Sequence, residues 1–232
     1  MKVRNKFIGI FDSGFGGLDI LKSIVKMLPE YGYIYLGDTA RAPYGTRSKE
    51  IVYEFTKQAV DFLFKNNCEL IILACKSVSS DALRKIQREY LPNKYLEKKV
   101  LGVLIPAVEE AVNKTKNKRV GVMATEGTVK SGAFVRELKK LDKKIQVIQQ
   151  ACPLLVPFVE AGEEKHKAVE LILKDYTRPF KKFGADTLIL GCTHYGVMEG
   201  YIRKIAGPEV VLISYIVHDF LLKLEKKFDK IF

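Results

Sequence analysis

Two of the four cysteines occupy matching places in two similar segments of the chain. Cys75 closes Glu69-Leu-Ile-Ile-Leu-Ala-Cys75, and Cys192 closes Asp186-Thr-Leu-Ile-Leu-Gly-Cys192, so each thiol follows an acidic residue, an apolar run and a small residue. Two thiols on opposite sides of a carbon can remove a proton from one face and deliver a proton to the other. Hydrolytic cysteine chemistry would need only one of them, with a histidine as its base. The pattern favours inversion of a stereocentre.

The other cysteines and the histidines divide into one candidate and several structural residues. Cys68 and Cys152 lie among apolar neighbours, which is typical of small buried side chains. His194 lies two residues after Cys192, so its ring is expected to point the same way along an extended strand end. It can polarise the thiol, bind a carboxylate or act as a base. The other two histidines fall in expected helices, and we interpret them as structural.

The composition is that of a globular protein, with 47% hydrophobic and 28% charged residues. The apolar run after the basic first residues is interrupted by Asp12, and no later run approaches the roughly twenty apolar residues of a membrane span. We therefore expect a cytoplasmic protein with no membrane partner. The cysteines form no C-x-x-C pair, so no zinc knuckle or thioredoxin-like site is expected, and no metal.

The net charge of +12 would attract polyanions. The lysines are scattered along expected helices, however, and no nucleic-acid motif or basic patch with interleaved aromatic residues accompanies them. A solvated surface is the better interpretation, and no nucleic-acid partner is expected.

Short runs rich in Val and Ile alternate with amphipathic stretches, which predicts βα units on parallel sheets. The expected strands are 7–11, 33–36, 70–74, 100–103, 119–123, 145–148, 187–190 and 210–213. The expected helices include 49–65, 79–90, 132–141 and 166–183. The repeat around the two cysteines divides these elements into two similar α/β halves.

We expect the first α/β domain to comprise residues 1–95 and 209–232, and the second to comprise 96–208. After the last strand, apolar residues spaced by three or four predict one more helix. They are Ile216, Phe220, Leu224, Phe228 and Ile231.

Ligands of open parallel sheets collect at the carboxyl ends of the strands, where loops present backbone donors. Most of the polar candidates fall at such ends, and we expect one cleft between the halves to gather them. They are Asp12, Ser13, Cys75, Ser77, Thr125, Thr128, Cys192, Thr193 and His194. The glycine-rich loop 13–17 suits an anion, although Asp19 breaks the G-x-G-x-x-G pattern of dinucleotide sites.

The chain resembles the glutamate racemases of the aspartate/glutamate racemase superfamily. The matching motifs run in the family's order over nearly the whole chain: Phe11-Asp-Ser-Gly-Phe-Gly-Gly17, Gly37-Asp-Thr-Ala-Arg-Ala-Pro-Tyr-Gly45, Ala74-Cys75, Thr125-Glu-Gly-Thr128, Ala151-Cys-Pro-Leu154 and Gly191-Cys-Thr-His-Tyr195. The resemblance implies two α/β domains related by pseudo-twofold symmetry. It also implies direct proton transfer on free glutamate without a cofactor, giving D-glutamate for peptidoglycan.

The resemblance also assigns roles to individual residues. Cys75 and Cys192 would be the two acid/base groups, assisted by Asp12 near the first and by Glu160 and His194 near the second. The implied substrate contacts are Asp12, Ser13, Tyr44, Gly45, Lys76, Ser77, Thr128, Thr193 and His194. A homodimer is left open.

Three places in the chain depart from the family pattern. Lys76-Ser77 replaces Asn-Thr, Gly196 replaces proline, and Ser214-Tyr215 stands where an aspartate commonly follows the last strand. If Lys76 points inward, it can lower the pKa of Cys75, hold a carboxylate or fill substrate space. If it points outward, it does little. The alternative function is a catalytically silent or altered-specificity paralogue that binds an acidic amino acid or a related metabolite.

Overall fold

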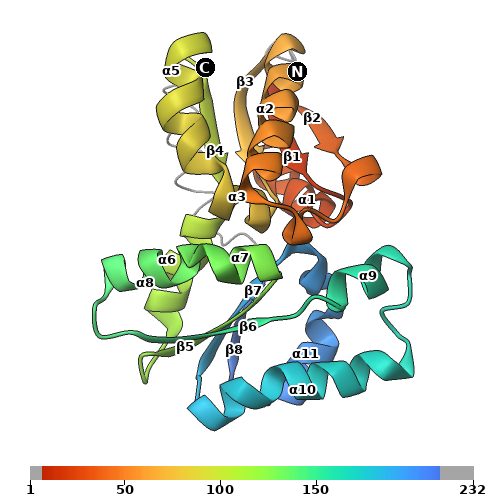
Figure 1. Cartoon of the computed structure of the whole chain (residues 1–232), viewed down its shortest axis with the longest axis vertical. Helices are drawn as coiled ribbons and strands as arrows, with labels where there is room; N and C mark the ends of the chain where they lie inside the picture. The colour runs from red at the N-terminus through yellow and green to blue at the C-terminus, as the bar shows by residue number, and fades with distance from the viewer. Residues whose placement is uncertain (1–6, 215–232) are drawn as a thin grey trace. The chain divides into compact units, whose positions relative to one another are not determined.

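The computed structural model describes residues 7–214, and their contacts divide them into two compact units after Pro106. Each unit contains a four-stranded parallel sheet with helices, as the expected α/β class requires (Figure 1). The expected boundary at 95/96 lies just before the strand Lys99–Gly102, which completes the first sheet. The expected boundary at 208/209 lies just before the strand Val211–Ile213, which completes the second sheet. The expected C-terminal helix lies outside the described residues.

The first unit has the strand order β2-β1-β3-β4. Its strands are β1 (Phe7–Asp12), β2 (Gly32–Gly37), β3 (Cys68–Leu73) and β4 (Lys99–Gly102). Its helical elements are α1 (Leu18–Met27), η1 (Thr39–Arg41), η2 (Tyr44–Thr46), α2 (Lys49–Lys65), α3 (Lys76–Asp81), α4 (Leu83–Lys85), the π-helical η3 (Ile86–Tyr90) and α5 (Leu91–Lys94).

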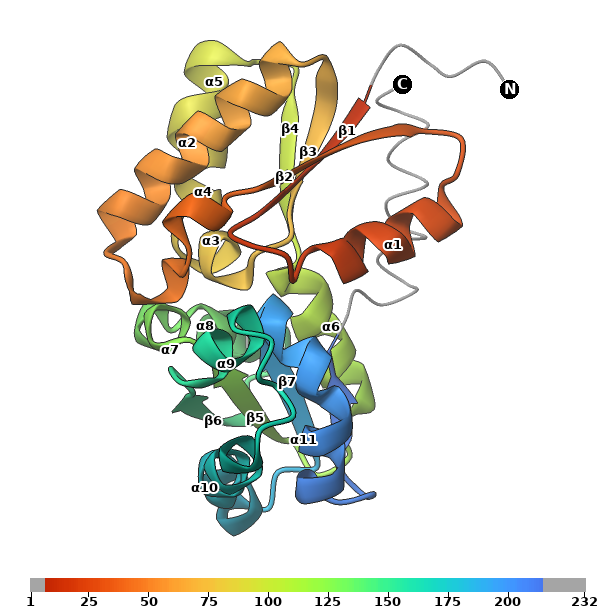
Figure 2. The same ribbon diagram turned by 90° about the vertical axis from the view of Figure 1, so that its right-hand side faces the viewer.

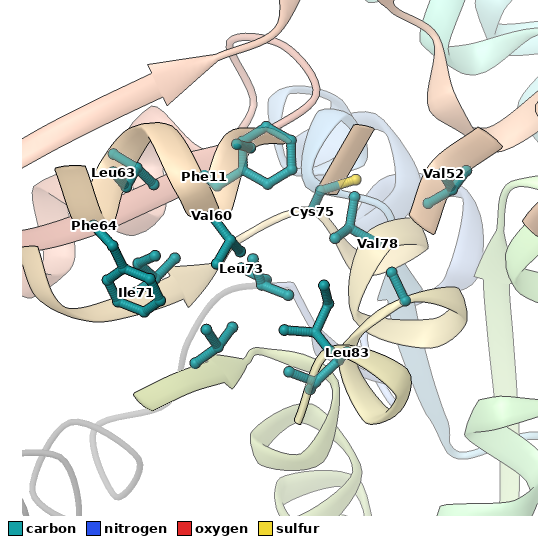
Figure 3. Packing of buried hydrophobic residues seen from close by; sticks show 14 of the residues in the cluster. Phe11, Val52, Val60, Leu63, Phe64, Ile71, Leu73, Cys75, Val78 and Leu83 are labelled. Carbon is teal, nitrogen blue, oxygen red and sulfur yellow. The ribbon is translucent and has the colours of Figure 1, made fainter. Parts of the chain in front are cut away.

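Helices cover both faces of this sheet because successive strand residues point to opposite sides (Figure 2). Ile8 and Ile10 of β1 form one buried cluster with Ile24 of α1. Phe11 belongs to the other cluster, which includes Leu63 of α2. Figure 3 shows this second cluster extending to the carboxyl end of β3, where Cys75 follows the strand.

The second unit repeats this topology with the order β6-β5-β7-β8. Its strands are β5 (Arg119–Ala124), β6 (Gln146–Ala151), β7 (Thr187–Gly191) and β8 (Val211–Ile213). Its helical elements are α7 (Glu126–Ser131), α8 (Ala133–Leu141), α9 (Leu155–Glu160), α10 (Lys167–Phe183), η4 (Thr193–Met198) and α11 (Glu199–Ala206), and α6 (Leu104–Lys114) spans the division between the units. In both sheets a cysteine follows the third strand along the chain, so the sequence repeat corresponds to a repeat of topology.

Three expected helices differ in detail from the observed ones. The helix expected over 166–183 begins one residue later, after its N-cap His166. The single helix expected over 79–90 is divided into α3, α4 and a π-helical turn, and the Gln87 side chain there donates a hydrogen bond to the Val100 carbonyl. The helix expected from Gly132 begins one residue later. Gly132 has a φ of 63°, a left-handed conformation that ends α7 and suits glycine.

The helices described for residues 7–214 are all too short or too polar to span a lipid bilayer.

Candidate functional site

Asp12 and Ser13 lie where β1 ends, and both are buried. The Asp12 carboxylate accepts a hydrogen bond of 2.9 Å from the Gly14 amide, which turns the chain sharply after the strand. A Cβ at Gly17 would lie 2.6 Å from the Asp12 Cβ, so α1 can begin this close to Asp12 only with glycine there. These contacts fix the loop that presents Ser13.

Cys75 lies at the carboxyl end of the neighbouring strand β3 and is the residue before α3. Its Sγ lies 3.4 Å from the Ser13 Oγ. The Ala74 amide donates to the Phe11 carbonyl, so the chain stays paired with β1 up to the residue before the thiol. Figure 3 shows the Cys75 side chain near the labelled side chains of Phe11 and Val78. The thiol therefore has a hydroxyl partner and lies at the start of a helix.

The loop after β2 carries Tyr44 and Gly45, which are buried. The Tyr44 hydroxyl donates to the Asp38 carboxylate, which also accepts from the Arg41 Nε at 2.6 Å. Burial and the hydrogen bond to Asp38 raise the pKa of Tyr44. Because its hydroxyl is engaged by Asp38, Tyr44 is better suited to offer backbone groups to a ligand. Asp38 belongs to the Gly37–Gly45 motif but was not among the site residues expected from the sequence.

Lys76 and Ser77 are the first two residues of α3, and both are buried. Lys76 is only 3% exposed, so its side chain does not extend into solvent. We call Asp12, Ser13, Tyr44, Gly45, Cys75, Lys76 and Ser77 the Cys75 group, and they all belong to the first unit.

Cys192 follows β7 in the second unit, and its Sγ lies 3.6 Å from His194 Nδ1. On the other side of the ring, His194 Nε2 forms a short hydrogen bond with Glu160 Oε1. Glu160 is the last residue of α9, which packs against the η4 turn that carries His194. The thiol, the imidazole and the carboxylate thus form a connected series.

Thr125 follows the end of β5, the strand next to β7, and Thr128 lies in α7. Ala124 is in register with Gly191, so the residues that follow them leave the sheet at the same edge. Thr125 is the N-cap of α7, and its hydroxyl lies 3.1 Å from that of Thr128. Thr193 is also buried. We call Thr128, Glu160, Cys192, Thr193 and His194 the Cys192 group.

No set of three His, Cys, Asp or Glu side chains that could hold a metal ion occurs within residues 7–214. A cavity of about 370 Å³ in the second unit is lined by residues of α10, α11 and the start of β7, including Phe180 and Leu188. It includes no member of the Cys192 group, which lies beyond the other end of β7.

The family model for Asp/Glu/Hydantoin racemase matches residues 8–214. The chain belongs to this family. It is 44% identical over 216 residues to the glutamate racemase of Sulfurihydrogenibium, covering 90% of this chain and 81% of that protein. It is 40% identical over 209 residues to the glutamate racemase of Geobacter metallireducens, covering 90% and 75% respectively.

Solved racemase structures resemble the fold of this chain. The glutamate racemase isoform RacE1 from Bacillus anthracis matches with a TM-score of 0.88 and 34% identity, covering 97% of this chain and 82% of that one. The glutamate racemase of Francisella tularensis in complex with D-glutamate matches with a TM-score of 0.87 and 35% identity, covering 98% and 83%. The expected two-domain α/β fold and the expected family are therefore confirmed.

Proposed function

We propose that this protein interconverts L- and D-glutamate by transfer of the Cα proton between two cysteines. The observation that carries the proposal is the equivalent position of Cys75 and Cys192 after the third strand of two sheets with the same order. Each thiol has its own polar partner, Ser13 for the first and His194 for the second. The glutamate racemases that share 40 to 44% identity with the chain support glutamate as the substrate.

Cys75 acts as a thiolate in one direction of the reaction. The thiolate accepts hydrogen bonds from the Ser13 hydroxyl and is stabilised by the partial positive charge at the start of α3. It removes the Cα proton of the bound amino acid, and the Cys192 thiol delivers its own proton to the opposite face of that carbon. Cys75 ends as a thiol and Cys192 as a thiolate. The reverse direction exchanges the two roles.

His194 and Glu160 prepare Cys192 for both roles. When the Glu160 carboxylate accepts a hydrogen bond from the Nε2–H, Nδ1 is left as the acceptor for the Cys192 S–H. After Cys192 has delivered its proton to the substrate, the ring keeps its Nε2 proton and its bond to Glu160, so it stays oriented for the return step. The carboxylate therefore sets both the tautomer and the orientation of the imidazole.

The remaining members of the two groups are proposed to bind the substrate. Asp12 faces the ammonium group, while the hydroxyls of Ser77, Thr128 and Thr193 and the backbone of Ser13 and of Tyr44-Gly45 bind carboxylates. Such groups bind charge without placing a strong competing base at Cα. Lys76 adds a buried cation beside Cys75, which favours an anionic substrate.

The burial of Lys76 also supports the alternative function, which is binding without catalysis. A cation in place of the family's neutral amide can hold an acidic metabolite so that no proton transfer follows. In that case the protein is a silent or altered-specificity paralogue. The two functions differ in whether optical rotation changes, because a binding protein leaves the enantiomer intact.

The test is polarimetry of L-glutamate, D-glutamate and L-aspartate with the wild-type protein. The proposal expects both glutamate solutions to lose rotation and reach the racemate, with aspartate at least tenfold slower. Binding of glutamate without any change in rotation would instead establish the alternative.

We further propose that the product D-glutamate serves bacterial peptidoglycan synthesis and that the enzyme works in the cytoplasm. We also propose that it forms a homodimer, and sedimentation tests this oligomeric state.

A further inference from the structure

Tyr195 directly follows His194 but plays no part in the proposed proton transfer. Its side chain is fully buried, and its hydroxyl donates a hydrogen bond of 2.9 Å to the Cys152 carbonyl. Burial, and then the charge of Cys192, raise the pKa of Tyr195, so the phenol stays protonated and keeps donating. This buried hydrogen bond connects two separate segments of the chain and holds them together.

The Cys152 carbonyl lies between the elements that carry Glu160 and His194. It accepts a second hydrogen bond, of 3.3 Å, from the Leu155 amide at the start of α9. The Cys152 amide donates to the Ala124 carbonyl at 2.8 Å, which anchors this residue to the end of β5. The carbonyl is therefore a fixed point shared by the sheet, by α9 and, through Tyr195, by η4.

Resting on the proposed function, we propose that Tyr195 is a positioning residue for the Cys192, His194 and Glu160 series. The bond to Cys152 fixes η4 against α9, and this spacing determines whether the His194 Nε2 reaches Glu160. The imidazole ring in turn presents Nδ1 to the Cys192 thiol. In this role Tyr195 acts through Glu160, and its hydroxyl bonds to the Cys152 carbonyl and not to a proton-transfer group.

Tyr195→Phe removes the hydroxyl and keeps the ring, and Cys152 retains its bond from Leu155, so the domain stays folded. Tyr33→Phe is the matched control, because the Tyr33 hydroxyl donates a 2.6 Å bond to the Leu28 carbonyl in the first unit. We expect Tyr195→Phe to lower kcat roughly tenfold with KM changed less than about twofold, since misplacement by about an ångström can cost 10²-fold. Tyr33→Phe should leave both constants unchanged.

A double-mutant cycle with Glu160→Ala separates positioning from general weakening of the fold. If Tyr195 acts through Glu160, the double variant loses no more activity than Glu160→Ala alone. A role confined to stability gives additive losses, and additive losses would overturn the proposal. Thermal unfolding of each variant shows that the comparison is made between folded proteins.

The second readout needs no turnover. The ring Nε2 proton of His194, assigned by comparison with His194→Asn, should give a slowly exchanging NMR signal in the wild type and in Tyr33→Phe. We expect Tyr195→Phe to shift or broaden this signal, and an unchanged signal would contradict the inference. Because this measurement is independent of substrate, it tests Tyr195 even if the wild type proves not to racemise glutamate.

Discussion

The Ser13 Oγ lies 3.4 Å from the Cys75 Sγ, although 61 residues separate them in the chain between the ends of two neighbouring parallel strands. A thiolate can only accept a hydrogen bond, so the hydroxyl becomes the donor when Cys75 ionises. A hydrogen bond to the charged form lowers the pKa of a thiol. Ser13 is therefore expected to increase the fraction of Cys75 thiolate at neutral pH.

Ser13→Ala should lower kcat roughly tenfold, the cost of losing one charge-assisted hydrogen bond. It should also move the acidic limb of the pH profile of kcat/KM to higher pH, because more alkaline conditions are then needed to form the thiolate. Ser23→Ala is the matched control, since its hydroxyl donates to the Asp19 carbonyl within α1. An unshifted limb in Ser13→Ala would refute this role.

The four cysteines should respond differently to replacement by serine. Cys75→Ser and Cys192→Ser should each abolish racemisation, because a hydroxyl is far too weak an acid to replace either thiol. Cys68→Ser and Cys152→Ser should leave the rate within about threefold. Burial raises the pKa of Cys68 to about 12 and also raises that of Cys152, so both stay neutral thiols. Equal tolerance of all four replacements, measured by polarimetry, would exclude the two-thiol mechanism.

Glu160→Gln should lower kcat by roughly 10- to 100-fold, the usual cost of losing a partner that orients a functional imidazole. The amide can still contact the His194 ring but no longer offers it a negative charge. Substrate KM should change little, because Glu160 acts through His194. A variant with wild-type kcat across the pH range would show that the short hydrogen bond serves only the fold. Glu163→Gln, three residues later, is the control.

Lys76→Met should raise KM for glutamate roughly tenfold and leave kcat within about threefold, because it removes a buried cation while keeping an unbranched side chain. Isothermal titration with D-glutamate provides the same comparison without turnover. The opposite result, a faster enzyme with an unchanged KM, would indicate that Lys76 occupies substrate space. Lys85→Met, on the neighbouring α4, controls for the loss of one positive charge.

Asp186 directly precedes β7, at the end of the strand opposite Cys192, and accepts hydrogen bonds from residues 115–117. Burial alone would raise its pKa, but hydrogen bonds from the Thr115 hydroxyl and from the amides of Lys116 and Asn117 outweigh burial and lower it. A lowered pKa in the folded state gives stability that is present above the unfolded-state pKa and lost as pH falls through the folded-state pKa.

Asp186→Asn should therefore destabilise the protein by about 1 to 2 kcal/mol near neutral pH, and this difference should shrink in acid. Calorimetry from neutral pH down to about pH 3 measures both effects. A difference in melting temperature that stays constant over this range would contradict the charge-based explanation. Asp175→Asn, on the exposed surface of α10, should have little effect at any pH.

The sequence predicted the central strands β1, β3, β5 and β7 well because they are buried on both faces and are therefore nearly continuous apolar runs. The edge strand β6 extends to Ala151, past the expected end at 148, because Gln149 and Gln150 interrupt its apolar run. The division of the helix expected over 79–90 could not be foreseen. Its apolar spacing is helical throughout, and the hydrogen bond from Gln87 to the Val100 carbonyl depends on tertiary contacts.

The candidate site was predictable to a smaller extent. Cys192 and His194 are two residues apart, so their proximity follows from local geometry. Glu160 came only from the family resemblance, because no local pattern connects a residue at the end of α9 with the η4 turn. The bonds from Tyr44 to Asp38 and from Tyr195 to Cys152 had no sequence signal, since a tyrosine hydroxyl can choose any nearby acceptor.

The most direct test of the central claim is NMR of L-glutamate in deuterated water with the purified protein, following the Cα proton alongside the optical rotation. Transfer through two thiols that exchange with solvent predicts that the Cα proton signal disappears as D-glutamate carrying deuterium accumulates, and that Cys192→Ser prevents inversion. Retention of the Cα proton with unchanged rotation, from protein shown to be folded and to bind glutamate, would contradict it.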